Sequence, residues 1–198
     1  MKRQDRESVM HRLRALALLL LLTAAIALMT ACGEENNLVD TLETEPLGDI
    51  KDFTASTVLD GHFGKEEIAS KDLTMMYFWS TDSDACLNEL LAVDRLWQIA
   101  PDNVQIVLYC MDPPESRDNI LITMEEYSYT GTALLEPRGD LEKLVEKVDT
   151  LPTVLFFNSK GEAVGPALIG GVDDPSEDYP DAIDDILEDM GKSSNWKE

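Results

Sequence analysis

Few side chains in this 198-residue chain could do covalent or metal chemistry. The chain has three cysteines, Cys32, Cys86 and Cys110, and two histidines, of which only His62 follows the first 31 residues. These are too few for a tetrahedral Cys/His zinc cluster or for a scaffold of several disulfides. A hydrolase triad of Ser83, His62 and an aspartate would need a coincidence of placement. We therefore expect no metal and no cofactor, and any covalent chemistry would depend on single thiols.

The chain is strongly acidic, with 16 basic and 39 acidic residues and a formal charge of −23. Binding to a nucleic-acid backbone is nearly excluded, because phosphate contacts need lysines and arginines that this surface lacks. One acidic run lacks the glycine and the alternating spacing of a calcium loop, so we interpret it as a solvated approach to a helix. The run consists of Asp173, Asp174, Glu177, Asp178, Asp181, Asp184 and Asp185.

The N-terminal segment has the pattern of a secretory signal. A basic start precedes residues 15–29, which are almost wholly apolar. This run of about 15 residues is short for a membrane-spanning helix, which needs about 20. The following Met29-Thr30-Ala31-Cys32 resembles the lipobox of bacterial lipoproteins, with Met29 in place of the usual leucine. The resemblance implies that Cys32 is lipidated and becomes the new N-terminus. An uncleaved anchor or an ordinary signal peptide is the alternative.

This pattern predicts four segments along the chain. Residues 1–31 form a lipoprotein signal peptide, residues 32–46 a flexible polar tether, residues 47–190 the folded domain and residues 191–198 a polar tail that frays. The domain is expected outside the cytoplasm, anchored to the bacterial cell membrane by the lipid on Cys32. Without residues 1–31 the chain has 11 basic and 37 acidic residues. Anionic lipid repels such a surface, so the lipid chain has to hold the protein at the membrane.

Strand-like and helix-like segments alternate from Leu47 onward, which is typical of an α/β fold. Asp60-Gly61 suits a tight turn, so Asp52–Leu59 and His62-Phe63 are predicted to form a β-hairpin. Leu73–Trp79 is a continuous apolar run, as expected for a central strand covered on both faces. Further strands are expected at Val104–Met111, Thr132–Leu135, Val154–Asn158 and Ala163–Ile169. Helices are expected between Ser83 and Pro101, at Glu115–Tyr127, at Leu141–Val148 with Asp140 as its cap, and at Pro180–Met190.

The order of these segments and their motifs resembles the thioredoxin-fold proteins of the membrane-anchored TlpA/ResA and redoxin type, over about residues 47–190. The matching motifs are Asp52-Phe53-Thr54, Leu59-Asp60-Gly61, Phe78-Trp79-Ser80-Thr81, Cys86 with Glu89, Leu151-Pro152-Thr153 and Lys160-Gly161. The resemblance implies a thioredoxin-like α/β fold, with a central mixed β-sheet flanked by helices and an N-terminal β-hairpin extension. It also implies a cis peptide bond before Pro152, which in thioredoxin folds lies against the active-site turn and helps to present an edge to extended substrate chains.

The family places a Cys-x-x-Cys motif at the turn between strand and helix, just after the position of Trp79. Here the four positions are Ser83-Asp84-Ala85-Cys86, so the nucleophilic first cysteine is replaced by a serine. A serine hydroxyl is too weakly acidic to replace the thiol and forms no disulfide. Ser83 suits the N-cap of the helix, with Asp84 in its first turn. Cys86 would face the core, where burial together with Asp82 and Asp84 raises its pKa, and we favour an inert thiol.

Two other interpretations of the thiols stay open. Peroxiredoxins use Thr-x-x-Cys on a related fold, and Ser83 and Cys86 have this spacing. Against this, Trp79 stands where that family has a proline. That family also uses a partner arginine, for which Arg138 is the only candidate that we name. Cys86 would then act alone, as a peroxidase or a single-thiol exchanger. The second open interpretation is a disulfide between Cys86 and Cys110, which could form in an oxidising compartment.

From these motifs we expect a membrane-anchored extracytoplasmic protein that is a non-catalytic binding or accessory module in envelope thiol–disulfide or cytochrome chemistry. Its partner would be an envelope protein, either an oxidoreductase or a component of cytochrome maturation. The rival interpretation is an enzyme, a single-thiol oxidoreductase or a peroxiredoxin-like peroxidase that uses Cys86. Dithiol–disulfide exchange is not expected, because Ser83 replaces the nucleophile.

Overall fold

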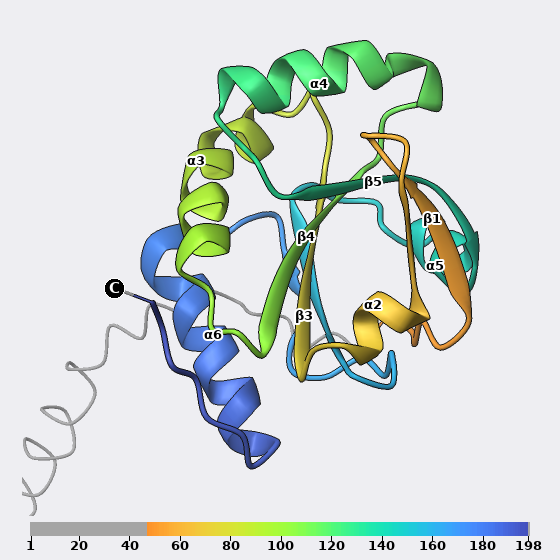
Figure 1. The fold of residues 1–198 in the computed structure, drawn as a ribbon. Coiled ribbons are helices and arrows are strands. Elements are labelled where there is room, and N and C mark those ends of the chain that lie inside the picture. Colours follow the sequence, from red (N-terminus) through yellow and green to blue (C-terminus); the bar gives the residue numbers. More distant parts are fainter. Residues whose placement is uncertain (1–46, 198) are drawn as a thin grey trace, which may run out of the picture. The chain divides into compact units, whose positions relative to one another are not determined.

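The computed structural model describes residues 47–197, which form the domain shown in Figure 1. The predicted signal peptide, the lipidation site Cys32 and the tether of residues 32–46 lie outside the described residues. Within residues 47–197, no helix is both long and apolar enough to cross a membrane.

Within residues 47–197, seven strands form one mixed sheet in the order β2-β1-β5-β4-β3-β6-β7. The strands are β1 (Phe53–Thr57), β2 (His62–Gly64), β3 (Leu73–Trp79), β4 (Val104–Cys110), β5 (Thr132–Gly139), β6 (Thr153–Asn158) and β7 (Leu168–Ile169). Strand β3 pairs in parallel with β4 and antiparallel with β6. All seven of its residues are buried, as the apolar run predicts. The predicted hairpin is confirmed by the antiparallel pairing of β1 with β2.

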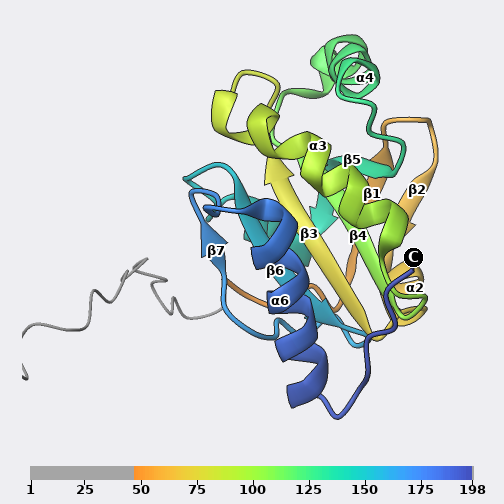
Figure 2. The same ribbon diagram turned by 90° about the vertical axis from the view of Figure 1, so that its left-hand side faces the viewer.

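Helices cover both faces of this sheet. They are α2 (Lys65–Ala69), α3 (Asp84–Ile99), α4 (Arg117–Glu126), α5 (Asp140–Val145) and α6 (Pro175–Asp189), and a 3-10 turn (Pro114–Ser116) leads into α4. Helices α3 and α6 lie side by side across one face of the sheet (Figure 2). The β3 side chains Tyr77 and Trp79 belong to the core beneath these helices. Met76 and Phe78 belong to the core on the other face, with α2 and α5.

One end of β3 leads into the predicted motif. Phe78 pairs with Thr153 of β6, and Thr153 follows Pro152. Trp79 ends β3, and the chain continues through a short turn into α3. The predicted cis-proline segment and the predicted motif therefore meet at this end of the sheet, which we call the thiol end.

The opposite end of β3 lies where the described chain begins. Leu73 pairs there with Asn158, the last residue of β6. The N–H of Ile50 donates to the carbonyl of Gly161, in the turn after β6, over 2.7 Å. We call this the entry end of the sheet, and it is separated from the thiol end by the length of β3.

The strand predictions are wrong where pairing depends on distant segments. Strand β5 continues to Gly139 instead of ending at Leu135, because its second half pairs with β1. The predicted strand Ala163–Ile169 is reduced to an isolated bridge at Ala163 and the two residues of β7. Gly165, with a φ of 67°, and the following Pro166 interrupt the extended backbone between them.

The helix predictions differ mainly at the starts of helices. Helix α6 begins at Pro175, five residues before the prediction, and Asp174 caps it by accepting the N–H of Ser176 (3.0 Å). The short helix α2 was not predicted.

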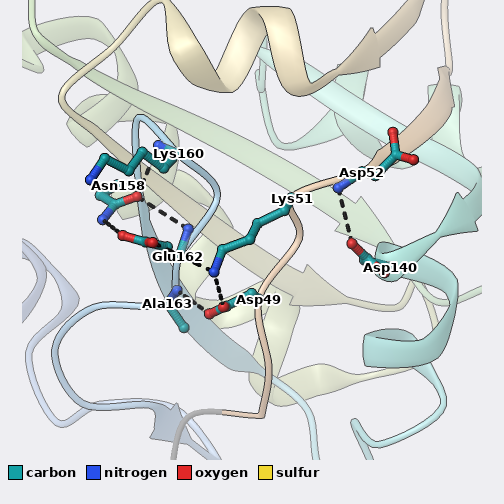
Figure 3. A network of polar contacts seen from close by, with 8 residues as sticks. All are labelled: Asp49, Lys51, Asp52, Asp140, Asn158, Lys160, Glu162 and Ala163. Atoms are coloured by element: carbon teal, nitrogen blue, oxygen red, sulfur yellow. Dashed lines mark hydrogen bonds and ion pairs between the residues drawn. The ribbon is translucent and has the colours of Figure 1, made fainter.

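The sequence predicts that Asp140 caps α5, but the structure does not have this cap. Gly139 is the N-cap and Asp140 is the first helical residue. The Asp140 carboxylate instead accepts the N–H of Asp52 over 2.9 Å (Figure 3). The N–H of Asp140 in turn donates to the carbonyl of Asp52 (3.0 Å). This side chain therefore joins the start of α5 to the segment before β1.

The described part of the tail, residues 191–197, contacts the domain instead of fraying. The indole N–H of Trp196 donates to the carboxylate of Asp184 in α6 (2.9 Å). The N–H of Lys197 donates to the carbonyl of Ile99 at the end of α3 (3.0 Å). The tail thus joins α6 to the last turn of α3.

Two glycines with similar backbone angles allow a test of how tightly the entry end is packed. Gly161 and Gly191 have φ angles of 72° and 68°. A Cβ on Gly161 would lie 2.5 Å from the Ile50 carbonyl oxygen, whereas one on Gly191 would meet nothing within 4 Å. We predict that Gly191→Ala lowers the free energy of unfolding by about 1 kcal/mol through backbone strain. Gly161→Ala should cost about 1–3 kcal/mol more, because the clash forces the backbone to shift. Urea unfolding measures both losses, and equal losses would contradict the prediction.

Candidate functional site

Ser83 starts helix α3 at the thiol end of the sheet. Its side-chain oxygen accepts the N–H of Cys86 (3.4 Å), and its carbonyl accepts the N–H of Leu87 (3.0 Å). The first bond satisfies an N–H group that has no partner within the helix, and the second is the first i→i−4 bond of the helix. The predicted N-cap role of Ser83 is confirmed, and Asp84 and Ala85 lie exposed in the first turn.

Asp112, which follows β4, holds the turn between β3 and α3. Its carboxylate accepts the N–H of Thr81 (3.0 Å), the hydroxyl of Thr81 (2.6 Å) and the hydroxyl of Ser80. Burial acts to raise the pKa of Asp112, but the hydrogen bonds from Ser80 and Thr81 outweigh it and hold the pKa below its usual value. The carboxylate is therefore ionised at neutral pH and joins β4 to the turn.

Glu89 is an acidic side chain turned into the core, and only 7% of the residue is exposed. One carboxylate oxygen, Oε2, accepts the hydroxyls of Tyr77 (3.2 Å) and Tyr179. The other, Oε1, accepts the N–H of Val172 (3.1 Å). Burial raises the pKa of both tyrosines and the charge of Glu89 raises it further, so both hydroxyls remain donors. Glu89 thereby joins α3 to β3, to α6 and to the loop before α6.

The Leu151–Pro152 peptide bond is cis, as predicted. The carbonyl of Pro152 accepts the N–H of Gly170 (2.8 Å). A Cβ on Gly171 would lie 3.4 Å from Cγ of Pro152 and 2.5 Å from Oε1 of Glu89. Gly171 therefore lies between the cis-proline loop and Glu89. Glu89 itself lies one helical turn after Cys86.

The fold that holds this site is found among solved structures, whereas no protein-family model and no curated protein matches the sequence. A secreted disulfide oxidoreductase of Mycobacterium tuberculosis, homologous to E. coli DsbE, is 14% identical at a TM-score of 0.52, over 73% of this chain and 98% of its own. The exposed lipoprotein thioredoxin Etrx1 of Streptococcus pneumoniae is 19% identical at a TM-score of 0.54, over 70% and 98%. StoA of Bacillus subtilis is 17% identical at 0.53, over 68% and 98%.

The domain has a thioredoxin-like fold. At these identities the similarity shows the fold alone, and the fold agrees with the expected mixed sheet flanked by helices. The Ser83–Cys86 turn, the cis-proline and the end of β3 lie together in this thioredoxin-like domain.

The Cys86 thiol is protected from solvent, because no part of the residue is exposed. Burial raises its pKa, and the negative charge of Glu89 raises it further. The sequence indicates Asp82 and Asp84 as the source of that second effect. This assignment is wrong, because both carboxylates lie in water, which screens them, while Glu89 lies in the core with the thiol.

The second described cysteine, Cys110, is also buried. It ends β4 opposite Trp79, and burial raises its pKa to about 12. Cys86 and Cys110 are both free thiols, so the disulfide that the sequence left open is not formed in the described residues. Trp79 lies in the same core, and its indole N–H has no hydrogen-bond partner among residues 47–197. This thioredoxin-like domain therefore carries no described thiol that is ionised at neutral pH.

Three other candidates from the sequence do not join the site. His62 lies on β2, and β1, β5 and β4 separate it from β3. Arg138 pairs with Thr54 where β5 meets β1, so it does not lie at the Cys86 turn. Most of the acidic run forms part of α6, whose cap is Asp174. Among residues 47–197, no group of three or more His, Cys, Asp or Glu side chains could hold a metal ion.

The sequence assigns no role to two carboxylates that the structure places in the site. Glu89 stands in the sequence only as part of a motif, although its spacing carries a signal. It lies three residues after Cys86 and one before Leu90, on the buried face of α3, where an acidic residue is unusual. Asp112 follows an apolar strand, and nothing local in the sequence indicates that it binds a turn 31 residues away.

Asp112→Asn tests whether this carboxylate holds the turn. We expect the free energy of unfolding at neutral pH to fall by about 2 kcal/mol, because hydrogen bonds to a charged group are lost. The native pKa lies below the unfolded value of about 3.9, so the stabilisation is present above that pH and disappears as the pH falls through the native pKa.

Chemical unfolding at several pH values checks this expectation. The curves of the wild type and the variant should converge as the solution is acidified below about pH 4. Asp82→Asn, which changes an exposed carboxylate in the same turn, is the control and should alter stability by less than about 0.5 kcal/mol. A difference between wild type and Asp112→Asn that stays constant down to acid pH would contradict the proposed role.

Proposed function

We propose that this protein is a membrane-anchored extracytoplasmic module with a thioredoxin-like fold, which binds a partner protein and does not exchange dithiols for disulfides. The observation that carries the proposal is that the motif has a serine in place of its first cysteine and a buried second cysteine. Ser83 stands where the nucleophilic cysteine of related motifs stands and serves as the N-cap of α3. Cys86, the remaining thiol, is buried.

Dithiol exchange needs two thiols that act in sequence. A thiolate attacks the substrate disulfide to form a mixed disulfide, and a second thiol resolves it. A serine hydroxyl cannot perform the first step. Cys86 cannot replace it readily, because its raised pKa leaves little thiolate and its burial blocks approach. Cys110 is buried in β4 and has a pKa of about 12.

The cis-proline loop supports binding to a partner. The loop retains the cis bond at Leu151–Pro152 and lies beside α3, and the N–H of Gly170 fixes it by donating to the Pro152 carbonyl. In thioredoxin folds this loop presents an edge to extended chains. A retained edge without a nucleophile supports binding without covalent chemistry. The partner we propose is an envelope oxidoreductase or a component of cytochrome maturation.

The anchoring part of the proposal rests on the N-terminal sequence. A basic start, an apolar run and small residues precede Cys32. Secretion and lipoprotein anchoring are also described for proteins of the same fold, the mycobacterial and pneumococcal ones respectively. We propose the same location for this chain.

Activity measurements test the missing nucleophile. We predict that the purified protein does not reduce a model protein disulfide in the presence of dithiothreitol. Ser83→Cys should create that activity, because the new thiol lies at the helix N-terminus at the family's spacing from Cys86. Adding Cys86→Ser should remove the gain, whereas adding Cys110→Ser should leave it.

The same measurements distinguish the binding module from the single-thiol enzyme. In the folded wild type a thiol reagent should label Cys86 and Cys110 only after unfolding. If the wild type turns over a disulfide or a peroxide, and Cys86→Ser abolishes this, the enzyme is right and the binding module is wrong. If Ser83→Cys gains no activity, the site does not support exchange even with the nucleophile restored.

Mass spectrometry of the N-terminus tests the anchor. We predict that the protein from the native membrane begins at Cys32 and carries a lipid on that residue. Cys32→Ser should leave the protein unlipidated. If the signal is still cleaved, the variant should leave the membrane fraction; if it is not cleaved, residues 1–31 should remain attached. An unmodified Cys32 within an intact N-terminal peptide of the wild type would overturn the anchor.

A further inference from the structure

An uncharged cleft of about 200 Å³ lies where the tip of the β1–β2 hairpin, the second half of α3, the end of α4 and the start of β5 meet (Figure 2). Residues that line it include Val58, Leu59, Trp97, Met124, Thr130 and Ala133. None of the described residues in its lining is charged, although acidic and basic residues make up 28% of the chain. The lining shares no residue with the thiol site described above.

Two large apolar side chains give this cleft an accessible surface. Leu59 is 75% exposed at the tip of the hairpin, a position where polar residues are usual, and Trp97 of α3 is 37% exposed. Val58, Met124 and Ala133 are buried and close the bottom of the cleft. The apolar contacts of a ligand would therefore be mainly with Leu59 and Trp97, which come from different elements.

Bonds within the chain hold the wall that carries Leu59. The N–H of Val58 donates to the carbonyl of Ala133 over 2.9 Å. The guanidinium of Arg117, at the start of α4, donates to the carbonyl of Val58 over 3.3 Å and pairs with the carboxylate of Asp60. The hairpin tip is therefore fixed in the folded chain, and the charges of Arg117 and Asp60 are already paired.

Close packing holds the indole of Trp97. Its ring centroid lies 6.5 Å from that of Tyr129. A Cβ on Gly131 would lie 2.9 Å from Cδ1 of Trp97 and 2.4 Å from the hydroxyl oxygen of Tyr129. The absence of a side chain at Gly131 therefore allows the two aromatic residues to pack at this wall of the cleft.

The charge around the cleft favours a neutral ligand. Moving an ion from water into a lining that holds no opposite charge costs free energy that no contact there restores. The buried carboxylate of Asp94 accepts the N–H of Thr130 (3.2 Å) and the side-chain amide of Gln98 (2.6 Å). Asp94 is 3% exposed and does not line the cleft, so it offers a cation no direct contact.

We propose that this cleft binds a small molecule with one neutral aromatic ring. A cavity of about 150 Å³ can hold benzene, so this cleft has room for a single ring with a small substituent. The indole of Trp97 favours an aromatic ring over an aliphatic one, because the quadrupoles of two rings attract each other in offset or edge-to-face arrangements. A protein interface needs about 800 Å² on each partner, far more than Leu59 and Trp97 offer, which favours a small molecule over a protein.

Fluorine NMR of the purified protein labelled with 5-fluorotryptophan tests the site. The chain has three tryptophans, so Trp79 in the core and Trp196 in the tail are internal controls, and Trp97→Phe identifies the resonance of Trp97. Benzyl alcohol should shift that resonance saturably and leave the other two. Cyclohexylmethanol, benzoate and benzylammonium, which lack either the aromatic ring or neutrality, should bind several-fold more weakly. No saturable shift of Trp97, a shift of all three resonances, or equal binding of any of these compounds would contradict the proposal.

A second cleft, of about 230 Å³, needs a control, because Trp97 lines it too, together with Lys71. Leu59→Gln changes only the first cleft and should weaken binding several-fold, whereas Lys71→Gln changes only the second and should leave binding unchanged. Ile122→Gln is the matched control, because Ile122 is 62% exposed and lines neither cleft. A loss with Lys71→Gln and none with Leu59→Gln would overturn the site. The measurement involves no thiol and no partner protein, so its result is independent of the proposed function.

Discussion

The site depends on one buried carboxylate, that of Glu89. Removing a carboxylate from water costs several kcal/mol unless its oxygens are satisfied. Here the hydroxyls of Tyr77 and Tyr179 and the N–H of Val172 satisfy them. These donors come from β3, α6 and the loop between β7 and α6, so the carboxylate is stable only when these elements are assembled around α3. The side chain therefore links the helix of the motif to the cis-proline side of the site.

The same carboxylate also disfavours reactivity of the neighbouring thiol. Cys86 lies one helical turn before Glu89, and the charge of Glu89 adds to the effect of burial in raising the thiol pKa. A helix N-terminus ordinarily lowers the pKa of a thiol, but mainly for a group at the first exposed N–H groups, which is the position of Ser83. Cys86 lies deeper, beside the core. Burial and the charge of Glu89 there outweigh the hydrogen bonds of Ser83 and Ser80, which act to lower the thiol pKa.

The sequence predicted the parts of the fold whose cause is local. The apolar run of β3, the N-cap at Ser83 and the tight turn at Asp60-Gly61 each follow from neighbouring residues, and the structure has all three. The resemblance supplied the cis bond at Pro152. The length of β5 depends on its pairing with β1, and the role of Asp140 depends on Asp52, 88 residues earlier. Contacts between such distant positions leave no mark in the local pattern, and the roles of Asp112 and Glu89 were missed for the same reason.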